Sequence, residues 1–508
     1  MITSLTSGEL SKRIRLDNMG LDPILQTLGH LSLSEYLSTF HINHSSPIQS
    51  SQDLIQLASQ YTQHLLGDDL AQSLSFTLGA YPVLLTANHH GVDYAPLCLH
   101  GSLLYSLGLK YQQDQKCPTS NTKRCVIPVF AYGSVPLNNS TYPRGILLSR
   151  KIRSGRSVKI NIFPSRLNRT MVSVTNSFTE SLIFNTIREI DQLLHKRTIS
   201  TPEHDTILQV LTEEYLRKDV LQQTSYSDQS VLLNNRLWKK MFADSISHTM
   251  PQMVYLEMEK LVSYVLELDM NNPNALVYRV FFDKTLRNSI FHELDGYYGC
   301  WDLKSLMAVQ SGQSDNTTSN SGTMFFWGVD SCGRRIHLRL IEKYKQTFLT
   351  GMDDSGQIHE YSFTPKGIVY AIKRKLLIPS LLTTFIVVSF ARGFKCFGGP
   401  WQVTYLPRMQ YGFVNALMKF KNYVDWGIQL SEIPTRNLIA GLTVVMALYS
   451  RYTTGAGLIE IATHHGLNND HISQICQISL KDAMSFFILS NSNSVLPVNF
   501  VKTIQLDL

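Results

Sequence analysis

The chain of 508 residues is 44% apolar and 17% charged, which is the composition of a globular protein long enough for two or three domains. Its mean hydropathy of -0.06, the polar segment Met1–Asn18 and seven cysteines without CxxC spacing argue against an integral membrane protein, a secretory signal, a disulfide framework and a zinc ribbon. The net charge of +7 is concentrated in stretches that lack Asp and Glu. We therefore expect a cytoplasmic protein without a membrane span and with a small anionic ligand.

Residues 1–80 are expected to form an N-terminal helical region, because apolar residues recur there at three- and four-residue spacing. The first part of an α/β core is expected over 81–175. Within it, an apolar run from Tyr81 to Ala87 predicts a buried strand, and Asp93 is the expected N-cap of the next helix. A second buried strand is predicted at Cys125–Gly133. This strand-helix-strand order indicates a parallel sheet.

A third strand is predicted at Val158–Pro164. A large helical insertion is expected over 176–300, where several segments, among them Met253–Leu268, show helical periodicity. The turn Asp330–Gly333 between two strand-like runs predicts a β-hairpin in a small β subdomain over 323–364.

The second part of the α/β core, with C-terminal helices, is expected over 365–508. Its most apolar segment, Leu376–Phe394, is interrupted by Pro379 and by hydroxyl side chains. A short helical turn followed by a buried strand at Thr383–Phe390 therefore explains this segment better than a membrane span. The predicted fold class is α/β, with a Rossmann-like parallel sheet core, a large helical insertion and a small β-hairpin subdomain.

The segment Thr86–Tyr94 is the first candidate for chemistry, because it lies where a strand ends and a helix begins. Ligands of parallel sheets bind at the carboxyl ends of strands, and a helix N-terminus suits an anion. Adjacent histidines in an extended loop point in different directions, so they are poor joint ligands of one metal, but one of them can act as a general base. The candidate catalytic residues are His89, His90 and Asp93, with Asn88 as a ligand-binding residue. The alternative is that Asp93 only caps the helix and the histidines satisfy hydrogen bonds of the loop.

Four later loops carry Gly, Arg or amide side chains that could hold anionic groups: Gly133–Gly145, Phe163–Arg169, Lys395–Leu406 and Ile433–Leu438. They form neither a Walker A nor a GxGxxG pattern. The candidate ligand-binding residues in them are Asn138, Asn139, Arg144, Ser165, Arg166, Arg169, Gly398, Gly399, Gln402, Tyr405 and Arg436. The alternative is a set of turn-rich surface loops.

Two stretches, Lys116–Thr179 and Lys366–Arg408, contain no Asp or Glu. They favour either an anionic ligand or a solvated basic face. Nucleic-acid binding through these stretches is the least favoured hypothesis, because they lack interleaved aromatic residues and any recognised motif.

The order of these motifs resembles the family of the bacillithiol-biosynthesis cysteine-adding enzyme, a cysteine ligase. The segment Thr86–Gly91, with His89 at the histidine position, is similar to a Gly-His-Gln loop of that family, and Pro128–Phe130 is similar to its Pro-Val-Phe strand. Gly398–Tyr405 is similar to a late Gly-Gly-Pro-x-Glu-x-x-Tyr motif, in which Gln402 replaces Glu. Pro434–Arg436 is nearly the Pro-x-x-Arg that follows.

This resemblance implies a Rossmann-like core with a helical coiled-coil insertion. It also implies an amide-forming or amino-acid-adding ligase of small-molecule biosynthesis, with a nucleotide as a candidate cofactor. The chain departs from the family after the second strand, where Ala131–Ser134 stands in place of a Glu-Asp-His-Asp cluster. A catalytically inactive nucleotide- or metabolite-binding protein is therefore the second hypothesis.

Overall fold

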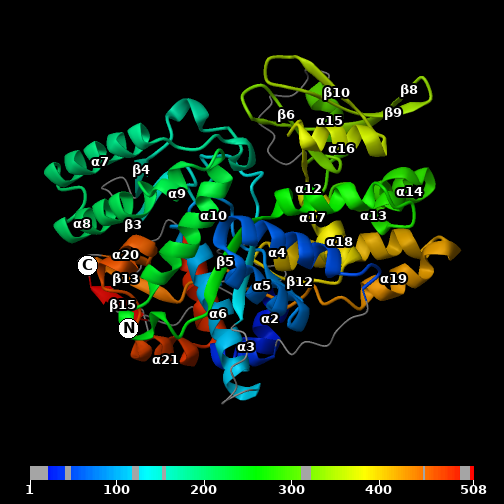
Figure 1. Cartoon of the computed structure of the whole chain (residues 1–508). Helices are drawn as coiled ribbons and strands as arrows, with labels where there is room; N and C mark the ends of the chain where they lie inside the picture. Colours follow the sequence, from blue (N-terminus) through cyan, green and yellow to red (C-terminus); the bar gives the residue numbers. More distant parts are fainter. Residues whose placement is uncertain are drawn as a thin grey trace.

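The computed structural model describes residues 21–39, 47–116, 125–151, 156–310, 322–449, 452–491 and 504–507. At its centre lies a four-stranded, all-parallel sheet with the strand order β12-β1-β2-β5 (Figure 1). These strands are β12 (Lys395–Phe397), β1 (Val83–Leu85), β2 (Val126–Ala131) and β5 (Gln252–Glu257). Four small antiparallel or mixed sheets accompany it, so the protein is a mixed α/β protein, as the composition of its predicted elements indicates.

The central sheet is covered by helices on both faces, which explains why its strands are apolar almost throughout. Successive side chains of a strand point to opposite faces, so Ile127 and Val129 pack in one core while Val126 and Phe130 pack in the other. On β5, Tyr255 packs in the same core as Ile127 and Val129, whereas its neighbours Val254 and Leu256 pack in the other.

One face of the sheet is covered by α6 (Pro96–Lys116), the helix that connects β1 to β2. The other face is covered by α4 (Gln52–Leu66), α5 (Asp68–Ala80) and α12 (Met258–Asp269). With α2 (Leu21–Leu28) and α3 (Leu33–Ser38), these elements confirm the helical prediction for the described part of 1–80; residues 1–20 and 40–46 lie outside the described residues.

The prediction of a helix over Met253–Leu268 is wrong at its start, because Met253–Glu257 belongs to strand β5 and only the part from Met258 is helical. This strand is the edge partner of β2, with Val129 opposite Tyr255. A short run of buried apolar residues has no periodicity that distinguishes a strand from a helix. Here the helical periodicity of the adjoining Met258–Asp269 segment made the whole run look helical.

The predicted strand at Thr383–Phe390 is also wrong. The segment forms α17 (Leu381–Phe385) and a π-helical turn (Ile386–Ala391), preceded by the short strand β11 (Leu377–Pro379). Both helical turns are buried on nearly all sides, so they need a continuous apolar run, as a buried strand does. The apolar run therefore cannot distinguish a helix from a strand here. Within the described residues, no helix is both long enough and apolar enough to cross a membrane.

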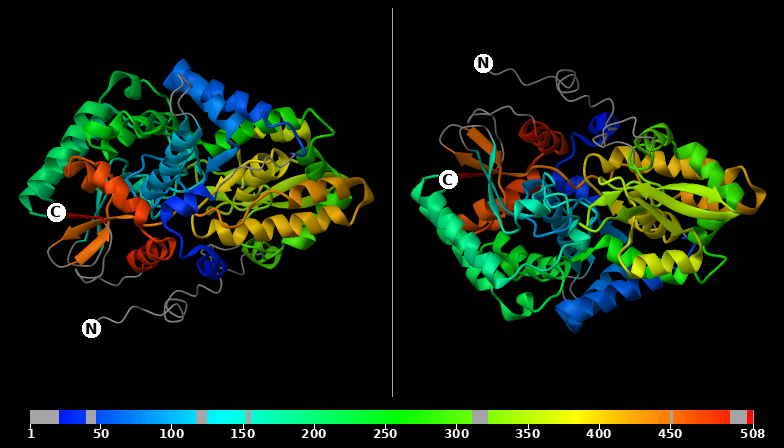
Figure 2. Two further views of the ribbon diagram at one scale, coloured as in Figure 1. Left: turned by 90° about the horizontal axis from the view of Figure 1, so that it is seen from below. Right: turned by 90° about the horizontal axis from the view of Figure 1, so that it is seen from above.

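The predicted third strand exists, but it lies outside the parallel sheet. It forms β4 (Ser157–Asn161), which pairs antiparallel with β3 (Gly145–Lys151). The helices that follow are α7 (Glu180–His195), α8 (Thr201–Val210), α9 (Lys218–Leu221), α10 (Tyr226–Leu237) and α11 (Asp244–Ser247). Figure 2 shows α7 and α8 at one end of the molecule and α18 (Gln402–Met418) and α19 (Val424–Ser431) at the other.

The predicted hairpin at Asp330–Gly333 is confirmed, because the turn joins β6 (Phe326–Val329) to β7 (Arg335–Ile336). Gly333 has φ +73°, a conformation that favours glycine. Strand β11 pairs with β6, and a second antiparallel sheet is formed by β8 (Arg339–Lys343), β9 (Gln346–Met352) and β10 (Ile358–Ser362).

The remaining elements complete the two ends of the molecule. The helices are α13 (Leu276–Phe282), α14 (Lys284–Leu294), α15 (Leu303–Gln310), α16 (Pro365–Lys373), α18 (Gln402–Met418), α19 (Val424–Ser431), α20 (Leu458–Thr463), α21 (Asn469–Gln477) and α22 (Leu480–Asn491). The C-terminal part was expected to be helical, but it also contains a sheet of β13 (Val445–Tyr449), β14 (Tyr452–Gly455) and β15 (Ile504–Asp507).

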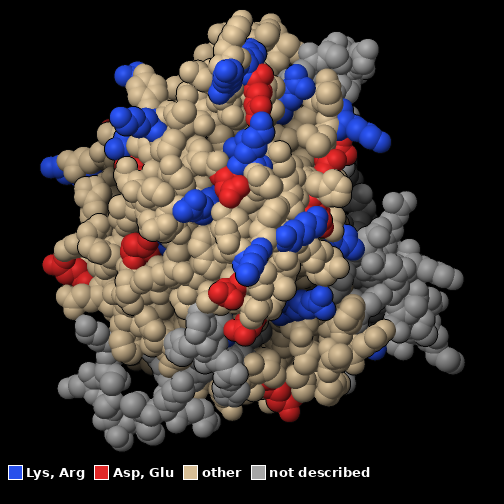
Figure 3. Space-filling view, turned by 90° about the vertical axis from the view of Figure 1, so that its right-hand side faces the viewer, with Lys and Arg blue, Asp and Glu red and all other residues tan. Residues whose placement is uncertain are grey.

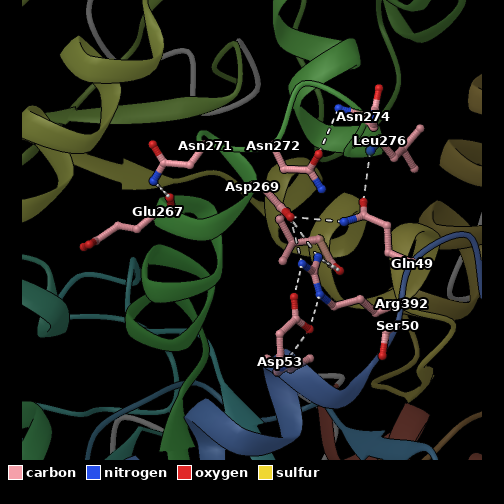
Figure 4. A network of polar contacts seen from close by, with 12 residues as sticks. Gln49, Ser50, Asp53, Glu267, Asp269, Asn271, Asn272, Asn274, Leu276 and Arg392 are labelled. Atoms are coloured by element: carbon pink, nitrogen blue, oxygen red, sulfur yellow. Dashed lines mark hydrogen bonds and ion pairs between the residues drawn. The ribbon is translucent and has the colours of Figure 1, made fainter.

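A buried ion-pair network joins Arg392 to the helices α4 and α12, which cover the same face of the sheet (Figure 4). The guanidinium of Arg392, which is 1% exposed, donates to both carboxylate oxygens of Asp53 on α4 and of Asp269 on α12. Gln49 donates to the same Asp269 carboxylate at 3.1 Å. The charge of Arg392, which lies in an acid-free stretch of the sequence, is therefore met by acids from elsewhere in the chain.

Candidate functional site

Three loops with polar side chains meet at one edge of the central sheet. Because β1, β2 and β12 are parallel, the segments that follow them, which begin at Thr86, Tyr132 and Gly398, leave the sheet side by side. The first two remain paired beyond the strands, since the His90 N–H donates to the Tyr132 carbonyl at 2.8 Å. The predicted meeting of strand-end loops therefore holds for three of them.

A cleft of about 870 Å³ opens over this edge. Three parts of the chain surround it: the strand-end loops, the start of α18, and the β6–β7 hairpin with the Tyr298–Cys300 segment. Its polar and aromatic lining residues are Thr86, His89, Cys98, Tyr132, Ser134, Ser140, Thr141, Tyr298, Cys300, Thr323, Trp327, Arg335, His337, Ser380, Trp401, Gln402, Tyr405 and Phe487. No Asp or Glu lines the cleft within the described part of the chain, so the cleft suits an anion.

His89 lies in the cleft wall, and its protonation state is fixed by Asn139. The Asn139 Oδ1 atom accepts from the Thr141 N–H at 3.1 Å, which identifies it as the oxygen of the amide. The Nδ1 atom of His89 lies 2.9 Å from that oxygen and must therefore donate to it. The neutral ring then has its lone pair on Nε2, and no described residue donates a hydrogen bond to that atom.

Burial lowers the pKa of His89, although the hydrogen bond to Asn139 acts in the opposite direction. The ring is therefore neutral at pH 7 and available as a proton acceptor. A half-buried imidazole with one nitrogen held by an oriented amide and the other free is the arrangement that a general base requires.

His90 points away from His89, as expected for neighbours in an extended loop. It is fully buried, and its Nε2 lies 2.9 Å from the Ser227 hydroxyl, which in turn donates to Glu257. His90 therefore donates through Nε2, while its buried Nδ1 has no partner among the described residues. The ring stacks on Tyr255 with a centroid distance of 5.6 Å. His90 supports the loop and does not line the cleft.

Asn88 and Asp93 also lie beneath the loop. The Asn88 amide donates to the Asp93 carboxylate at 2.9 Å, and the Asp93 N–H donates to Asn234 on α10 at 2.9 Å. The prediction of Asp93 as helix N-cap is wrong, because α6 begins at Pro96, three residues later; the Asp93 carboxylate instead accepts from the Ala95 N–H just before the helix. Burial raises the pKa of Asp93 to about 7.

Two buried acids from the Gln252–Asp269 segment reach the loop that follows β2, where Ala131–Ser134 stands in place of the acidic cluster of the resembling family. The carboxylate of Glu259 accepts from the Gly133 and Ser134 N–H groups at 2.7 and 2.9 Å. Burial and the neighbouring Glu257 raise the pKa of Glu259 to about 7. A Cβ atom on Gly133 would lie 2.9 Å from Glu257 and 2.5 Å from Ser173, so only glycine fits there.

The Gly398–Tyr405 segment forms the other wall of the cleft. Gln402 is the first residue of α18, as expected for a helix start, and it is buried. Its Oε1 atom accepts from Thr86 at 2.9 Å and its Nε2 atom donates to the Cys396 carbonyl at 3.1 Å, so it joins β1 to β12. Gly399 and Tyr405 line the cleft, whereas Gly398 lies beneath it and pairs with Ile439.

The only arginine among the residues that line the cleft is Arg335 of β7. Its guanidinium lies 4.7 Å from the ring centre of Trp327, and no described acid pairs with it. Desolvation by the surrounding atoms and the nearby Arg169 lower the pKa of Arg335, although the residue keeps an exposed surface toward solvent. His337, two residues further, donates from Nδ1 to the Gly322 carbonyl at 2.5 Å.

The other predicted ligand-binding residues do not line the cleft. Arg144 donates to the Phe163 carbonyl at 2.6 Å, and Arg169 pairs with Asp354 at 2.6 Å. Arg144 lies directly before β3 and Arg169 lies after β4, and this hairpin is outside the parallel sheet. The residues placed at the surface are Asn138, Ser165, Arg166, Arg169 and Arg436.

Several cations of the acid-free stretches pair with acids from other parts of the chain. Figure 3 shows a face of the molecule on which Lys and Arg side chains lie among Asp and Glu. Arg150 pairs with the fully buried Glu203 at 3.0 Å, so this charge too is met by an acid from another segment.

Sequence reasoning missed three residues that now matter most: Arg335, Glu257 and Glu259. Arg335 and His337 are two residues apart in a strand-like run, a spacing that places both side chains on one face of a strand. This spacing is the signal that could have identified them as candidate ligand-binding residues. The two glutamates were hidden by the helical interpretation of Met253–Leu268.

Comparisons with protein-family models, curated proteins and solved structures gave no match to this chain, so its function has to be argued from the cleft itself.

Proposed function

We propose that this protein is an enzyme that binds a small anionic molecule in the cleft and uses His89 as a general base. The observation that carries the proposal is the pairing of His89 with Asn139, which directs the ring proton to Nδ1 and leaves Nε2 as an acceptor. Arg335 supplies positive charge on the facing hairpin, in a cleft without described acids.

The reaction class that fits this arrangement is a transfer or ligation. In such a reaction, Nε2 of His89 takes the proton of an amine or hydroxyl nucleophile as that nucleophile attacks an electrophilic acyl carbon of the co-substrate. The bond from that carbon to its leaving group then breaks, and the leaving group departs with the electron pair. Cys98 also lines the cleft, but burial and the nearby Asp93 raise the pKa of its thiol, so it is not a suitable nucleophile.

The resemblance to the cysteine-adding ligase family supports this class. Two of the segments that carry the resemblance, Thr86–Gly91 and Gly398–Tyr405, contribute residues to the same cleft. We extend the proposal to a Rossmann-like core, since the parallel sheet binds its ligand at the carboxyl ends of its strands in that fold. A nucleotide is then a candidate co-substrate.

A metabolite-binding protein without turnover is the second candidate. Gln402 favours it, because an amide replaces the glutamate of the family motif and both of its polar atoms are used within the protein. A residue that only holds two strands together contributes no charge to a reaction.

Thermal-shift screening against amino acids, amino sugars and phosphorylated metabolites tests the proposal. A ligand at a hundred times its dissociation constant stabilises the fold by about 2.7 kcal/mol, which is easily detected. We expect at least one anion to stabilise the wild type and Arg166→Met, a control outside the cleft, but not Arg335→Met. If Arg335→Met is stabilised equally, the anion does not bind in this cleft.

The two candidates differ in turnover of the ligand that the screen identifies. An enzyme converts it, and His89→Gln lowers the rate by about 10²–10⁴-fold while binding persists. Turnover that is unchanged in His89→Gln contradicts the proposed role, and binding without turnover in the wild type establishes the second candidate.

A further inference from the structure

Three aromatic rings form a stacked surface at the cleft, here called the aromatic ledge: Tyr298, Trp401 and Tyr405. The ring of Tyr298 lies 6.4 Å from that of Trp401 with an interplanar angle of 22°, and 5.6 Å from that of Tyr405 with an angle of 29°. Two segments far apart in the sequence therefore present nearly parallel rings to the same space.

The aromatic ledge is exposed to an unusual degree for rings that are held in fixed positions. Tyr298 is 63% exposed and Trp401 is 54% exposed. Among the exposed aromatic residues that the structure describes, these two form the stacked pair. Exposed rings that line a concave site mark a place where a ligand covers them.

The backbone beside the aromatic ledge is built to keep Tyr298 in place. Gly299 has φ +81°, and a Cβ atom there would lie 2.6 Å from Met409 and 2.8 Å from Leu381. The segment can therefore pack closely on α17 and α18 only with glycine at this position, and the packed segment carries Tyr298 against Tyr405.

The hairpin side of the cleft complements the aromatic ledge. There Arg335 lies over Trp327 and has no acidic partner among the described residues. One cleft thus offers uncovered flat rings and one unpaired positive charge.

We propose that the ligand of the cleft carries a planar unsaturated ring, which lies on the aromatic ledge, together with an anionic group, which pairs with Arg335. The inference rests on the proposed function, because it assumes that the cleft is the ligand site, and it adds the chemical class of the ligand. A nucleoside phosphate and an aromatic carboxylate share this chemistry.

Isothermal titration calorimetry with two matched pairs of probes tests the inference. Adenosine 5′-monophosphate is compared with ribose 5-phosphate, which lacks the ring, and phenylacetate with cyclohexylacetate, whose ring is not planar. We expect at least one planar probe to bind roughly tenfold more tightly than its partner, the size of effect that one aromatic stacking contact produces. The pair that shows the preference identifies the source of the ring.

Variants locate the effect. Tyr298→Leu and Trp401→Leu are expected to abolish the preference for the planar probe, whereas Tyr411→Leu, an exposed aromatic on the same helix α18 but outside the cleft, keeps it. If both members of each pair bind equally, or if Tyr298→Leu and Trp401→Leu keep the preference, the inference is overturned while the anion site stands. If Arg335→Met leaves the binding of every probe unchanged, or if no probe binds at all, the inference fails together with the anion site of the proposed function.

Discussion

Two buried polar regions of this protein differ in how many of their polar atoms have a hydrogen-bonding partner. One surrounds Arg392 and the other is the Thr86–Asp93 loop. Every guanidinium nitrogen of Arg392 has a partner, and its charge faces two carboxylates. In the Thr86–Asp93 loop, the buried Asn88 Oδ1 and His90 Nδ1 atoms have no partner among the described residues, and the neighbouring His89 has one free nitrogen.

This difference separates the two roles that buried polar groups can have. A complete network fixes the packing of the segments that it joins, whereas an incomplete one costs stability and persists where a ligand or a reaction uses it. On this ground we propose a structural role for the Arg392 network and a functional role for the Thr86–Asp93 loop.

Removing the centre of the complete network is expected to have the largest effect. Arg392→Leu leaves the carboxylates of Asp53 and Asp269 facing each other without a counter-charge, so the free energy of unfolding should fall by about 3–5 kcal/mol. Denaturant titration measures this loss, with Arg166→Leu at the exposed surface as a control within about 0.5 kcal/mol of the wild type. A loss below about 1 kcal/mol for Arg392→Leu would remove the contrast between the two regions.

The acid beneath the cleft predicts a pH-dependent stability. The pKa of Glu259 is raised to about 7 in the folded protein from an ordinary value of 4.5, so its contribution to stability is fully present below pH 4.5 and is lost as the pH rises through 7. Relative to Glu259→Gln, the wild type should lose up to roughly 3 kcal/mol of unfolding free energy over this range.

Comparing wild type and variant at each pH cancels the other titrating groups. Glu342→Gln serves as a control, because Lys284 lowers the pKa of this exposed acid and the pH effect has the opposite sign. A difference between wild type and Glu259→Gln that does not change with pH would show that Glu259 is not protonated in the folded protein near neutrality.

Replacing His90 sharpens the distinction within the incomplete region. His90→Leu removes the hydrogen bond to Ser227 but also the unpartnered Nδ1 atom, so the unfolding free energy should fall by only about 1–3 kcal/mol. Ligand affinity should change little, since His90 does not line the cleft. Complete loss of ligand binding in a stably folded His90→Leu would place His90 in the site itself.

The smallest effect is expected from Asn139→Asp. A carboxylate at this position stabilises the protonated ring, which raises the pKa of His89 from its lowered value. The pH at which turnover is half-maximal should therefore move upward by about one unit, with a rate loss that approaches tenfold only well below the pKa of the wild-type ring. An unchanged pH profile would mean that His89 is not the group whose titration limits the rate.

Much of the architecture could be predicted because it depends on local pattern. The strand before Thr86, the strand at Cys125–Gly133 and the turn at Asp330–Gly333 follow from apolar runs and turn residues, and all three are present. The strands before the loops at Thr86 and Tyr132 were expected from their apolar runs. The third strand, β12, was not predicted, because the strand in this part of the chain was placed at Thr383–Phe390.

The remainder depends on contacts between distant segments. Arg144 and Arg166 were attractive because they lie in an acid-free stretch, but their hairpin lies outside the parallel sheet. Arg392 is paired with acids more than a hundred residues away in the sequence. The local charge pattern around Arg392 could not indicate these partners. Residues such as Arg335 become recognisable only once the hairpin is placed over the sheet edge.

The tautomer of His89 tests the central claim most directly, and it can be measured without knowing the substrate. Nitrogen-15 NMR of the imidazole side chains, with the His89 signals assigned by their loss in His89→Gln, reports which ring nitrogen carries the proton. We expect a neutral ring at pH 7 that is protonated at Nδ1, with a free Nε2 lone pair. A ring protonated at Nε2, or a charged imidazolium at this pH, would contradict the role of His89 as the base of this cleft.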